Sequence, residues 1–299
     1  MRYFLSLSYD GSPFCGWQIQ REAPSVQECL EGALSRLLGR PVAVTGAGRT
    51  DSGVHAFSYI AHFDLEDSLP FEASDITYKL NAILPREIAV HGVWPVADDL
   101  HARFSAKRRE YTYFINREKD PFVRNFSWYC GYPGLDFQAM NDACHYLLGT
   151  HDFTCFEKSG SDNKTSVCTV FAASWQPYIP SHLQIMGAET DEGVDLQTHG
   201  HPRPCKREGP AAKGCGRGRS EAEAVCESIP SAVDNYWYFR IAADRFLRNM
   251  VRAIVGTLIE VGRGKHRPEW IAGLIESGTR SDAGESVPGH ALFLNKVDY

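Results

Sequence analysis

Long apolar runs are missing from this chain of 299 residues. A membrane-spanning helix needs about 18 or more consecutive apolar residues, and no such stretch occurs. The first nine residues alternate apolar and polar side chains, which is typical of a strand and not of a secretion signal. We therefore expect a cytoplasmic protein that does not enter a membrane.

Paired cysteines are missing as well. The nine cysteines are odd in number and none stands in a C-x-x-C pair, so free thiols are expected rather than disulfides.

Residues 187–234 are rich in glycine and proline, which predicts a flexible insertion without a core. Its histidines and cysteines match no compact zinc finger, so no metal is expected. Its basic residues contact either RNA phosphates or solvent. The potential ligands in it are His199, His201, Cys205, Cys215 and Cys226.

An overall excess of positive charge is also missing. The net charge is −6 and the pI is about 6.0, which for the whole chain argues against nucleic-acid binding. However, residues 101–125 carry seven Lys/Arg against three Asp/Glu, and residues 240–267 carry seven against two. Two basic segments on an otherwise acidic chain predict a local anion-binding groove; the alternative is ordinary solvated surface charge.

The pattern of residues 1–100 predicts a ferredoxin-like unit. Strands follow from alternating or β-branched apolar residues. The first helix begins at Ser25, where Glu28 completes a capping box. The order β-α-β-β-α-β is that of the split βαβ unit. The expected strands are 2–9, 42–45, 57–64 and 88–96, and the expected helices are 25–39 and 73–84.

Residues 101–299 repeat this composition of strands and two main helices. We therefore predict an α+β protein of two ferredoxin-like halves, 1–100 and 101–299, that form one extended, mostly antiparallel sheet with helices on one face. The expected strands are 109–115, 126–131, 168–175, 182–186, 236–242 and 291–298, and the expected helices are 136–148, 245–261 and 268–276.

The stretch 46–55 (GAGRTDSGVH) is the strongest candidate for chemistry. Three glycines in eight residues allow a tight loop that a ligand can approach closely. Asp51 has a plain alternative explanation, because Asp before Ser-Gly favours a turn. Arg49, two residues away, would keep such a carboxylate ionised and oriented. His55 adds a second titratable group.

A second candidate is a row of cations in the expected helix 245–261. Arg245, Arg248 and Arg252 are spaced at i, i+3 and i+7, which places them on one helical face. Such a row suits phosphates or a buried carboxylate, and the alternative is ordinary surface charge.

Collinear motifs along nearly the whole chain resemble the tRNA pseudouridine synthase A family. One such motif would be weak, but this many in the same order are specific. They are 9–11 (YDG), 16–18 (GWQ), 25–28 (SVQE), 47–55 (AGRTDSGVH), 81–85 (NAILP), 101–106 (HARFSA), 111–113 (YTY), 151–153 (HDF), 246–252 (FLRNMVR) and 287–292 (VPGHAL).

The resemblance implies isomerisation of uridine to pseudouridine in the anticodon stem-loop of tRNA, at nucleotides 38–40, without a cofactor. Asp51 matches the family's catalytic aspartate, which acts on a flipped-out base. Tyr111 matches the tyrosine that stacks on the uracil, and Arg252 the arginine that pairs with the aspartate. We expect Arg49 to fill the space that the base leaves. The resemblance also implies a homodimer in which one tRNA touches both subunits.

Five further basic residues are predicted to contact RNA. They are Arg103, Lys107, Arg108, Arg245 and Arg248.

Two other functions remain compatible with the residues alone. One is a non-catalytic RNA-binding protein of the same fold, and the other is a metal hydrolase that uses Asp51 and His55. The sequence does not choose between attack of Asp51 on the sugar, attack on the ring and a glycal route.

Overall fold

The computed structural model describes residues 1–158, 160, 164–185 and 232–299. The insertion predicted at 187–234, with its potential metal ligands and basic residues, lies outside the described residues up to position 231. The described chain divides into two units, which are considered separately. The larger unit is Met1–Gln176 with Trp237–Tyr299, and the smaller is Pro177–Tyr236.

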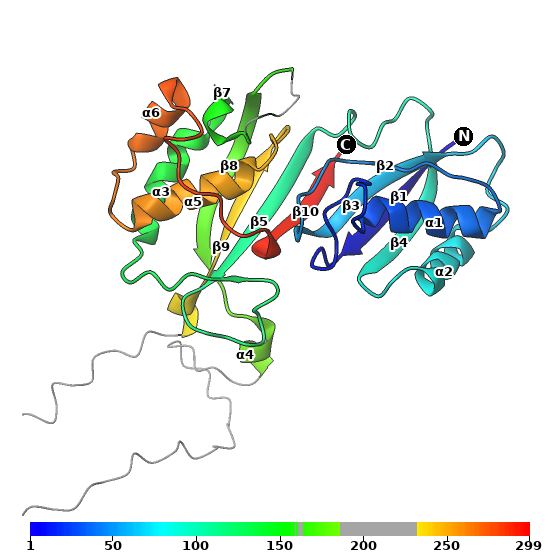
Figure 1. The fold of residues 1–299 in the computed structure, drawn as a ribbon, viewed down its shortest axis with the longest axis horizontal. Coiled ribbons are helices and arrows are strands. Elements are labelled where there is room, and N and C mark those ends of the chain that lie inside the picture. The colour runs from blue at the N-terminus through cyan, green and yellow to red at the C-terminus, as the bar shows by residue number, and fades with distance from the viewer. Residues whose placement is uncertain (159, 161–163, 186–231) are drawn as a thin grey trace, which may run out of the picture. The chain divides into compact units, whose positions relative to one another are not determined.

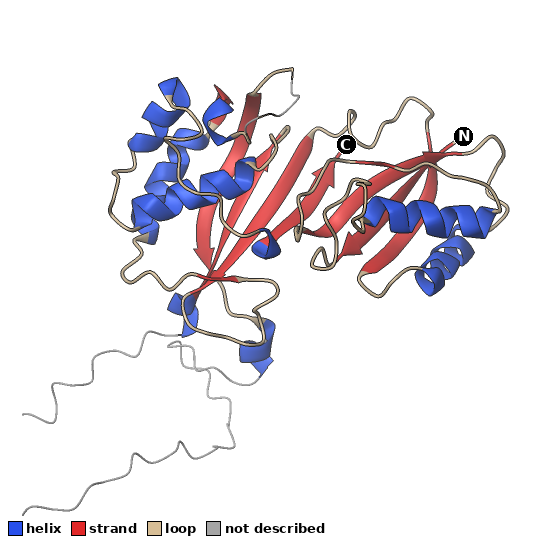
Figure 2. Ribbon diagram, in the orientation of Figure 1, coloured by secondary structure: helices blue, strands red, loops and turns tan. Residues whose placement is uncertain are grey.

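The larger unit is an α+β structure built on one mixed, mostly antiparallel sheet of ten strands (Figures 1 and 2). The strand order is β4-β1-β3-β10-β5-β9-β8-β7, with β2 beside β3 and β6 beside β5. The strands are β1 (Arg2–Tyr9), β2 (Thr45–Gly46), β3 (His55–Asp64), β4 (Ile88–Val96), β5 (Arg108–Asn116), β6 (Trp128–Tyr129), β7 (Gly149–Asp152), β8 (Val167–Pro177), β9 (Tyr236–Ala243) and β10 (Leu292–Asp298).

Five helices belong to the same unit, and Figure 2 shows α1 and α2 over the N-terminal strands. The helix α1 begins as the sequence predicts, because Ser25 Oγ accepts a hydrogen bond from Glu28 N at 3.2 Å. It ends at Gly39, which takes the left-handed conformation that glycine favours (φ +69°). The helices are α1 (Val26–Leu38), α2 (Ala73–Ile83), α3 (Phe137–Cys144), α5 (Met250–Gly262) and α6 (Trp270–Ser277).

Strand β1 separates two hydrophobic clusters because its side chains alternate between the faces of the sheet. Leu5 and Leu7 are buried in the main core with α1 and α2. On the other face, Phe4 packs with Ile60 and Ala102 in a smaller cluster. No helix among the described residues is long and apolar enough to span a bilayer.

The strand predicted at 42–45 is wrong except for its last residue. Val42 and Val44 are buried as expected, but their N–H groups donate to side chains of α1 and not to a neighbouring strand. The acceptors are Ser35 Oγ at 3.0 Å and Glu31 Oε1 at 2.9 Å. Because these backbone groups are satisfied by a helix, no ladder forms before β2.

The long helix predicted at 245–261 begins five residues late, at Met250. Asn249 has a positive φ of +66°, a conformation that interrupts a right-handed helix and that Asn tolerates better than most residues. Its side chain donates to Ser286 Oγ at 2.6 Å. Arg245 and Arg248 therefore lie in the preceding loop, and the predicted helical row of three arginines does not form.

In the smaller unit, the strand predicted at 182–186 is a short helix, α4 (Ser181–Ile185). Its first turn is closed by Leu183 N and Gln184 N, which both donate to Pro180 O. Short apolar runs are compatible with a helix or a strand, and the preceding proline favours a helix start.

Other differences from the predicted elements concern only their length. The helix 136–148 ends as a 3-10 turn (His145–Leu147), and the strand 126–131 shortens to β6.

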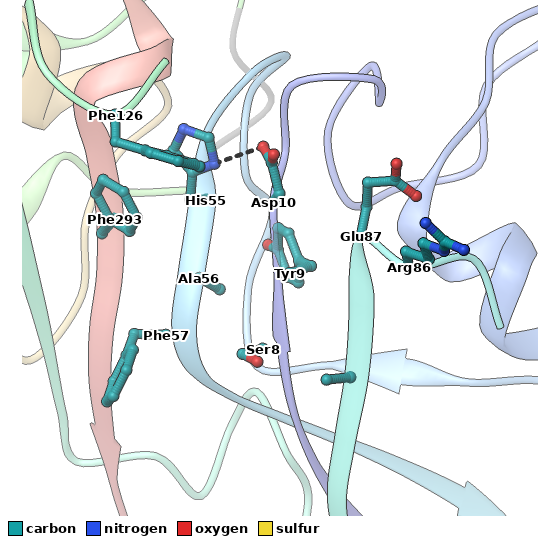
Figure 3. A pocket seen from close by; sticks show the side chains of 11 residues that line it. Ser8, Tyr9, Asp10, His55, Ala56, Phe57, Arg86, Glu87, Phe126 and Phe293 are labelled. Atoms are coloured by element: carbon teal, nitrogen blue, oxygen red, sulfur yellow. Dashed lines mark ion pairs between the residues drawn. The ribbon is translucent and has the colours of Figure 1, made fainter. Parts of the chain in front are cut away.

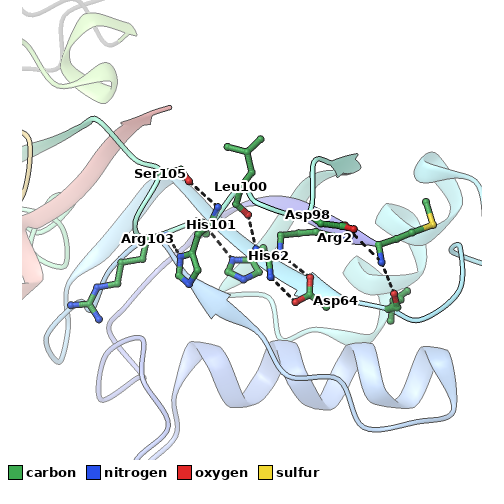
Figure 4. Close-up of polar contacts among 11 residues, drawn as sticks. Arg2, His62, Asp64, Asp98, Leu100, His101, Arg103 and Ser105 are labelled. Atoms are coloured by element: carbon green, nitrogen blue, oxygen red, sulfur yellow. Dashed lines mark hydrogen bonds and ion pairs between the residues drawn. The ribbon is translucent and has the colours of Figure 1, made fainter.

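His62 on β3 lies beneath the turn at 101–105, on the face that carries the smaller cluster (Figure 4). The side chain is only 5% exposed, and its Nδ1 accepts a hydrogen bond from Ala102 N at 3.2 Å. Burial, assisted by the positive charge of Arg2, lowers the pKa of His62 to about 4. The imidazole is therefore neutral in the folded protein at pH 7.

The free energy of unfolding should fall as the pH is lowered from about 6.5 to 4, because unfolded His62 binds a proton in this interval and folded His62 does not. The loss is on the order of 2–3 kcal/mol. Denaturant titrations of His62→Gln should show a flatter pH profile than wild type. The exposed His145→Gln is the control and should keep the wild-type slope. Equal slopes for His62→Gln and wild type would contradict the assignment.

Candidate active site

The loop between β2 and β3 carries Asp51 and is packed against two glycines. At Gly16 (φ +93°) an added Cβ would overlap the Thr50 carbonyl oxygen, and at Gly11 it would overlap the Val54 carbonyl oxygen. Both positions therefore require glycine for close backbone approach. The loop cannot move toward these segments, and this limits where the Asp51 carboxylate can lie.

Buried tyrosines hold the loop from beneath. Tyr9 Oη and Thr50 Oγ1 are 2.9 Å apart, and Tyr59 Oη donates to Gly48 O. The Trp17 ring stacks on Tyr59 with centroids 4.2 Å apart. Burial raises the pKa of both tyrosines well above the usual value, so both hydroxyls stay protonated and available as donors.

His55 has a structural position in which both ring nitrogens are engaged. Its Nδ1 accepts from Gly11 N at 2.9 Å, so we assign the proton to Nε2, which donates to His290 O at 2.8 Å. Burial lowers the pKa of His55. The Asp10 carboxylate lies 3.1 Å from Nδ1 (Figure 3), but an ion pair there requires a protonated ring. If His55 were a metal ligand, as in a metal hydrolase, one ring nitrogen would have to give up its contact with Gly11 N or with His290 O.

A cavity of about 250 Å³ opens beside His55 (Figure 3). Its aromatic walls are Phe57, Phe126 and Phe293. Neither Asp51 nor Tyr111 lines it. We therefore do not place the chemistry in this cavity.

Asp51 lies between Arg248, in the loop that leads into α5, and Arg252, in the first turn of α5. Arg252 Nη1 is 3.4 Å from Asp51 Oδ2, and Arg248 Nε is 4.0 Å from Oδ1. The Arg252 side chain is itself fixed, since its Nε donates to Val287 O at 2.7 Å. The Asp51 side chain remains 28% exposed, so a substrate can reach the carboxylate that the arginines orient.

Tyr111 on β5 lies near the same carboxylate. Burial raises the pKa of Tyr111 to about 12, Arg109 opposes this shift, and the negative charge of Asp51 adds to it. The ring packs edge-on against Phe246 at 5.1 Å. Its hydroxyl has no hydrogen-bond partner among the described residues, which leaves a protonated donor next to Asp51.

The structure pairs Asp51 with Arg252 and Arg248 rather than with Arg49. Arg49 is exposed and lines a small pocket together with Arg103. The residues of this pocket come from the Asp51 loop, from the segment around Trp17 and from the turn that follows β4. Arg49 therefore faces outward at the rim of the site.

The other predicted RNA-binding residues are not gathered around Asp51. Arg108 lies 3.7 Å from the buried Glu110. Strand alternation places both on the opposite face of β5 from Tyr111. Lys107 is exposed and Arg245 is half-buried. RNA contacts by these residues remain predictions.

Comparison with known proteins gives consistent results. The sequence profile of the tRNA pseudouridine synthase family matches residues 6–105 and 143–299. The chain is 43% identical to tRNA pseudouridine synthase A of Bacteroides thetaiotaomicron over 298 residues, covering 100% of this chain and 90% of the relative. It is 40% identical to that of Porphyromonas gingivalis, covering 100% and 97%. For Parabacteroides distasonis the identity is 41%, covering 100% and 96%.

The chain belongs to the tRNA pseudouridine synthase family. This confirms the family resemblance that the sequence motifs indicated, and it makes the chain an isomerase.

Arg109 is a residue of this pseudouridine synthase that the sequence reasoning missed. Its guanidinium donates only to backbone carbonyls: to Ala47 O at 3.0 Å, Asp244 O at 2.7 Å, Arg103 O at 2.6 Å and Ala106 O at 3.4 Å. It thus joins the Asp51 loop, the 101–106 turn and the loop before α5. One signal was available, because period two puts this cation on the same face as Tyr111.

We predict that Gly16→Ala destabilises the synthase by at least about 2 kcal/mol, because an alanine must adopt a positive φ and meets the Thr50 carbonyl. Gly32→Ala is the matched control. Gly32 lies in α1 with open space around it, so alanine should stabilise by about 0.5–1 kcal/mol. Chemical denaturation measures both. Equal effects of the two substitutions would show that the loop tolerates movement.

We predict that Arg109→Lys lowers kcat of the isomerisation more than it raises KM, because an ammonium group cannot hold all four carbonyls in place. Stability should fall by about 1–3 kcal/mol, since partly buried carbonyls lose their partners. Arg36→Lys, at an exposed position of α1, is the control and should leave kcat unchanged. If Arg109→Lys lowers only the stability and keeps the wild-type kcat at low temperature, Arg109 does not position the active site.

Proposed function

We propose that this synthase isomerises uridine to pseudouridine in the anticodon stem-loop of tRNA, with Asp51 acting on a flipped-out base. The observation that carries the proposal is the Asp51 carboxylate, partly exposed and 3.4 Å from Arg252 Nη1. The relatives are named tRNA pseudouridine synthase A, which supports tRNA as the substrate.

The reaction breaks the bond between N1 of uracil and C1′ of ribose and forms a bond between C5 and C1′. The proton on C5 leaves, and N1 gains one. A carboxylate serves this exchange either as a nucleophile or by stabilising a developing positive charge on the sugar. Arg252 and Arg248 contact the Asp51 carboxylate and orient it, which both routes require.

Tyr111 is proposed to stack on the uracil and to donate from its hydroxyl. A pKa of about 12 keeps that hydroxyl protonated near neutral pH, so it is suited to hydrogen bonding with a uracil carbonyl. Its unpaired position among the described residues supports this role. Arg49 is proposed to occupy the space from which the base is flipped, and its exposed position at the rim supports that role.

The RNA is proposed to lie along the two basic segments, with contacts from Arg103, Lys107, Arg108, Arg245 and Arg248. Exposed Arg248 beside Asp51 is the best placed of these. We also propose a homodimer that binds one tRNA across both subunits, which rests on the family resemblance. A cytoplasmic location is proposed as well, and it is supported by six free cysteines among the described residues.

We propose that the sheet consists of two ferredoxin-like halves with helices on one face. In the first half, β4, β1 and β3 are antiparallel neighbours with β2 beside β3, and α1 and α2 connect them in the split βαβ order. In the second half, α3, α5 and α6 accompany the neighbouring strands β5, β9, β8 and β7.

The decisive experiment is tritium release from C5-labelled uridine in an unmodified tRNA transcript. Asp51→Asn should lower kcat by at least about 10³-fold, because the amide cannot act as a carboxylate, while tRNA binding is kept. Asp75→Asn, at an exposed position of α2, is the control and should release tritium at the wild-type rate. Tight tRNA binding without release by wild type would favour a non-catalytic RNA-binding protein.

A further inference from the structure

We propose that Phe104 and Arg103 form a second RNA contact beside the active site, where an unpaired base stacks on the Phe104 ring and Arg103 binds a neighbouring phosphate. This proposal rests on tRNA being the substrate. It assigns a binding role to an aromatic side chain that the charge pattern alone does not single out.

Phe104 is an apolar side chain turned to solvent. Its residue is 77% exposed, among the largest values for an aromatic residue in the described part of the chain. Exposed aromatic rings at ordered positions often mark binding surfaces, since the ring could otherwise gain free energy by burial.

The turn that carries Phe104 is closed by hydrogen bonds among its own residues (Figure 4). His101 Nδ1 accepts from Arg103 N at 3.1 Å and from Phe104 N at 3.3 Å. The turn closes through Ser105, whose N donates to His101 O and whose Oγ accepts from His101 N, both at 2.9 Å. Because the backbone is already ordered, a ligand would lose little binding free energy to fixing it.

The Phe104 ring has the His101 ring and the Arg103 guanidinium as neighbours. The His101 ring packs against it at a tilt, with centroids 4.4 Å apart, and His101 in turn packs edge-on against buried His62 at 4.7 Å. At 77% exposure most of the Phe104 side chain remains accessible. An accessible aromatic ring beside an arginine is the kind of platform on which nucleobases stack.

Arg103 supplies the charge next to this platform. Its guanidinium carbon is 5.6 Å from the Phe104 ring centroid. Arg103 also lines the small pocket with Arg49, and no carboxylate belongs to that lining. An arginine over an exposed aromatic ring, next to a pocket that holds a second arginine and no carboxylate, suits a nucleic-acid backbone better than a protein surface.

Arg109 connects the platform to the catalytic loop. Its guanidinium donates to Arg103 O at 2.6 Å and to Ala47 O at 3.0 Å. A base bound on Phe104 is therefore held in a fixed relation to the segment that carries Arg49 and Asp51. We infer that this contact sets the register of the RNA while another nucleotide is flipped.

The first test measures binding of an unmodified tRNA transcript by filter retention. Phe104→Ala should weaken binding between about fivefold and a hundredfold, the range for one lost base stack. Phe104→Trp should retain affinity, because it keeps a stacking face. Tyr78→Ala is the matched control, since Tyr78 is 76% exposed on α2, and it should bind as wild type. Unchanged affinity of Phe104→Ala would overturn the proposal.

Salt dependence separates the two residues. Arg103→Gln should reduce the slope of log affinity against log salt concentration by about 0.7–0.9, the value for one phosphate contact. Phe104→Ala should weaken binding equally at every salt concentration. An unchanged slope for Arg103→Gln would show that Arg103 does not contact a phosphate.

Two controls keep this proposal separate from the proposed function and from a protein interface. Binding is measured without turnover. A wild-type protein that binds tRNA but shows no activity would therefore contradict the proposed isomerase function and leave the Phe104 contact untouched. Light scattering reports the oligomeric state. If Phe104→Ala changes the oligomeric state together with the affinity, the surface is a contact between copies of the chain and the RNA platform is wrong.

Discussion

The backbone ladders of β10 determine where the active site forms. This last strand lies between β3, to which it is parallel, and β5, to which it is antiparallel. Leu294 is registered with Ala56 on one side and with Tyr111 on the other. The loop that enters β3 with Asp51 is thereby brought toward Tyr111, although 60 residues separate them in the chain. A one-residue slip of β10 would turn its own side chains, Leu294 among them, to the wrong face of the sheet.

Two arginines at the site are neutralised in different ways. Arg252 points at a carboxylate, and the pair remains partly open to solvent. Arg109 pairs with no carboxylate among the described residues and donates to backbone carbonyls instead. A cation that holds carbonyls stiffens three loops without adding a competing carboxylate near Asp51. The charge available to the substrate is therefore that of Asp51 and its two arginines.

Local sequence signals predicted most elements where local interactions decide the structure. The capping box at Ser25 set the start of α1, and period-two alternation located β1, β5 and β9. The prediction failed where distant groups satisfied the backbone. In the stretch 42–45, side chains of α1 accept the backbone hydrogen bonds that a neighbouring strand would have accepted. The helix predicted from 245 begins only at Met250, because Asn249 is left-handed and its side chain donates to Ser286.

The sequence by itself determined the family, the loop that carries Asp51 and the glycines that allow it, because these depend on residue type and on short spacing. The resemblance already implied that Arg252, 201 positions away, pairs with the aspartate, and only the tertiary structure decided that Arg248 meets Asp51 as well. It also decided that both ring nitrogens of His55 are engaged by backbone groups and that Arg109 joins three loops around the site. These properties depend on burial and on hydrogen bonds between distant segments, which residue spacing does not encode.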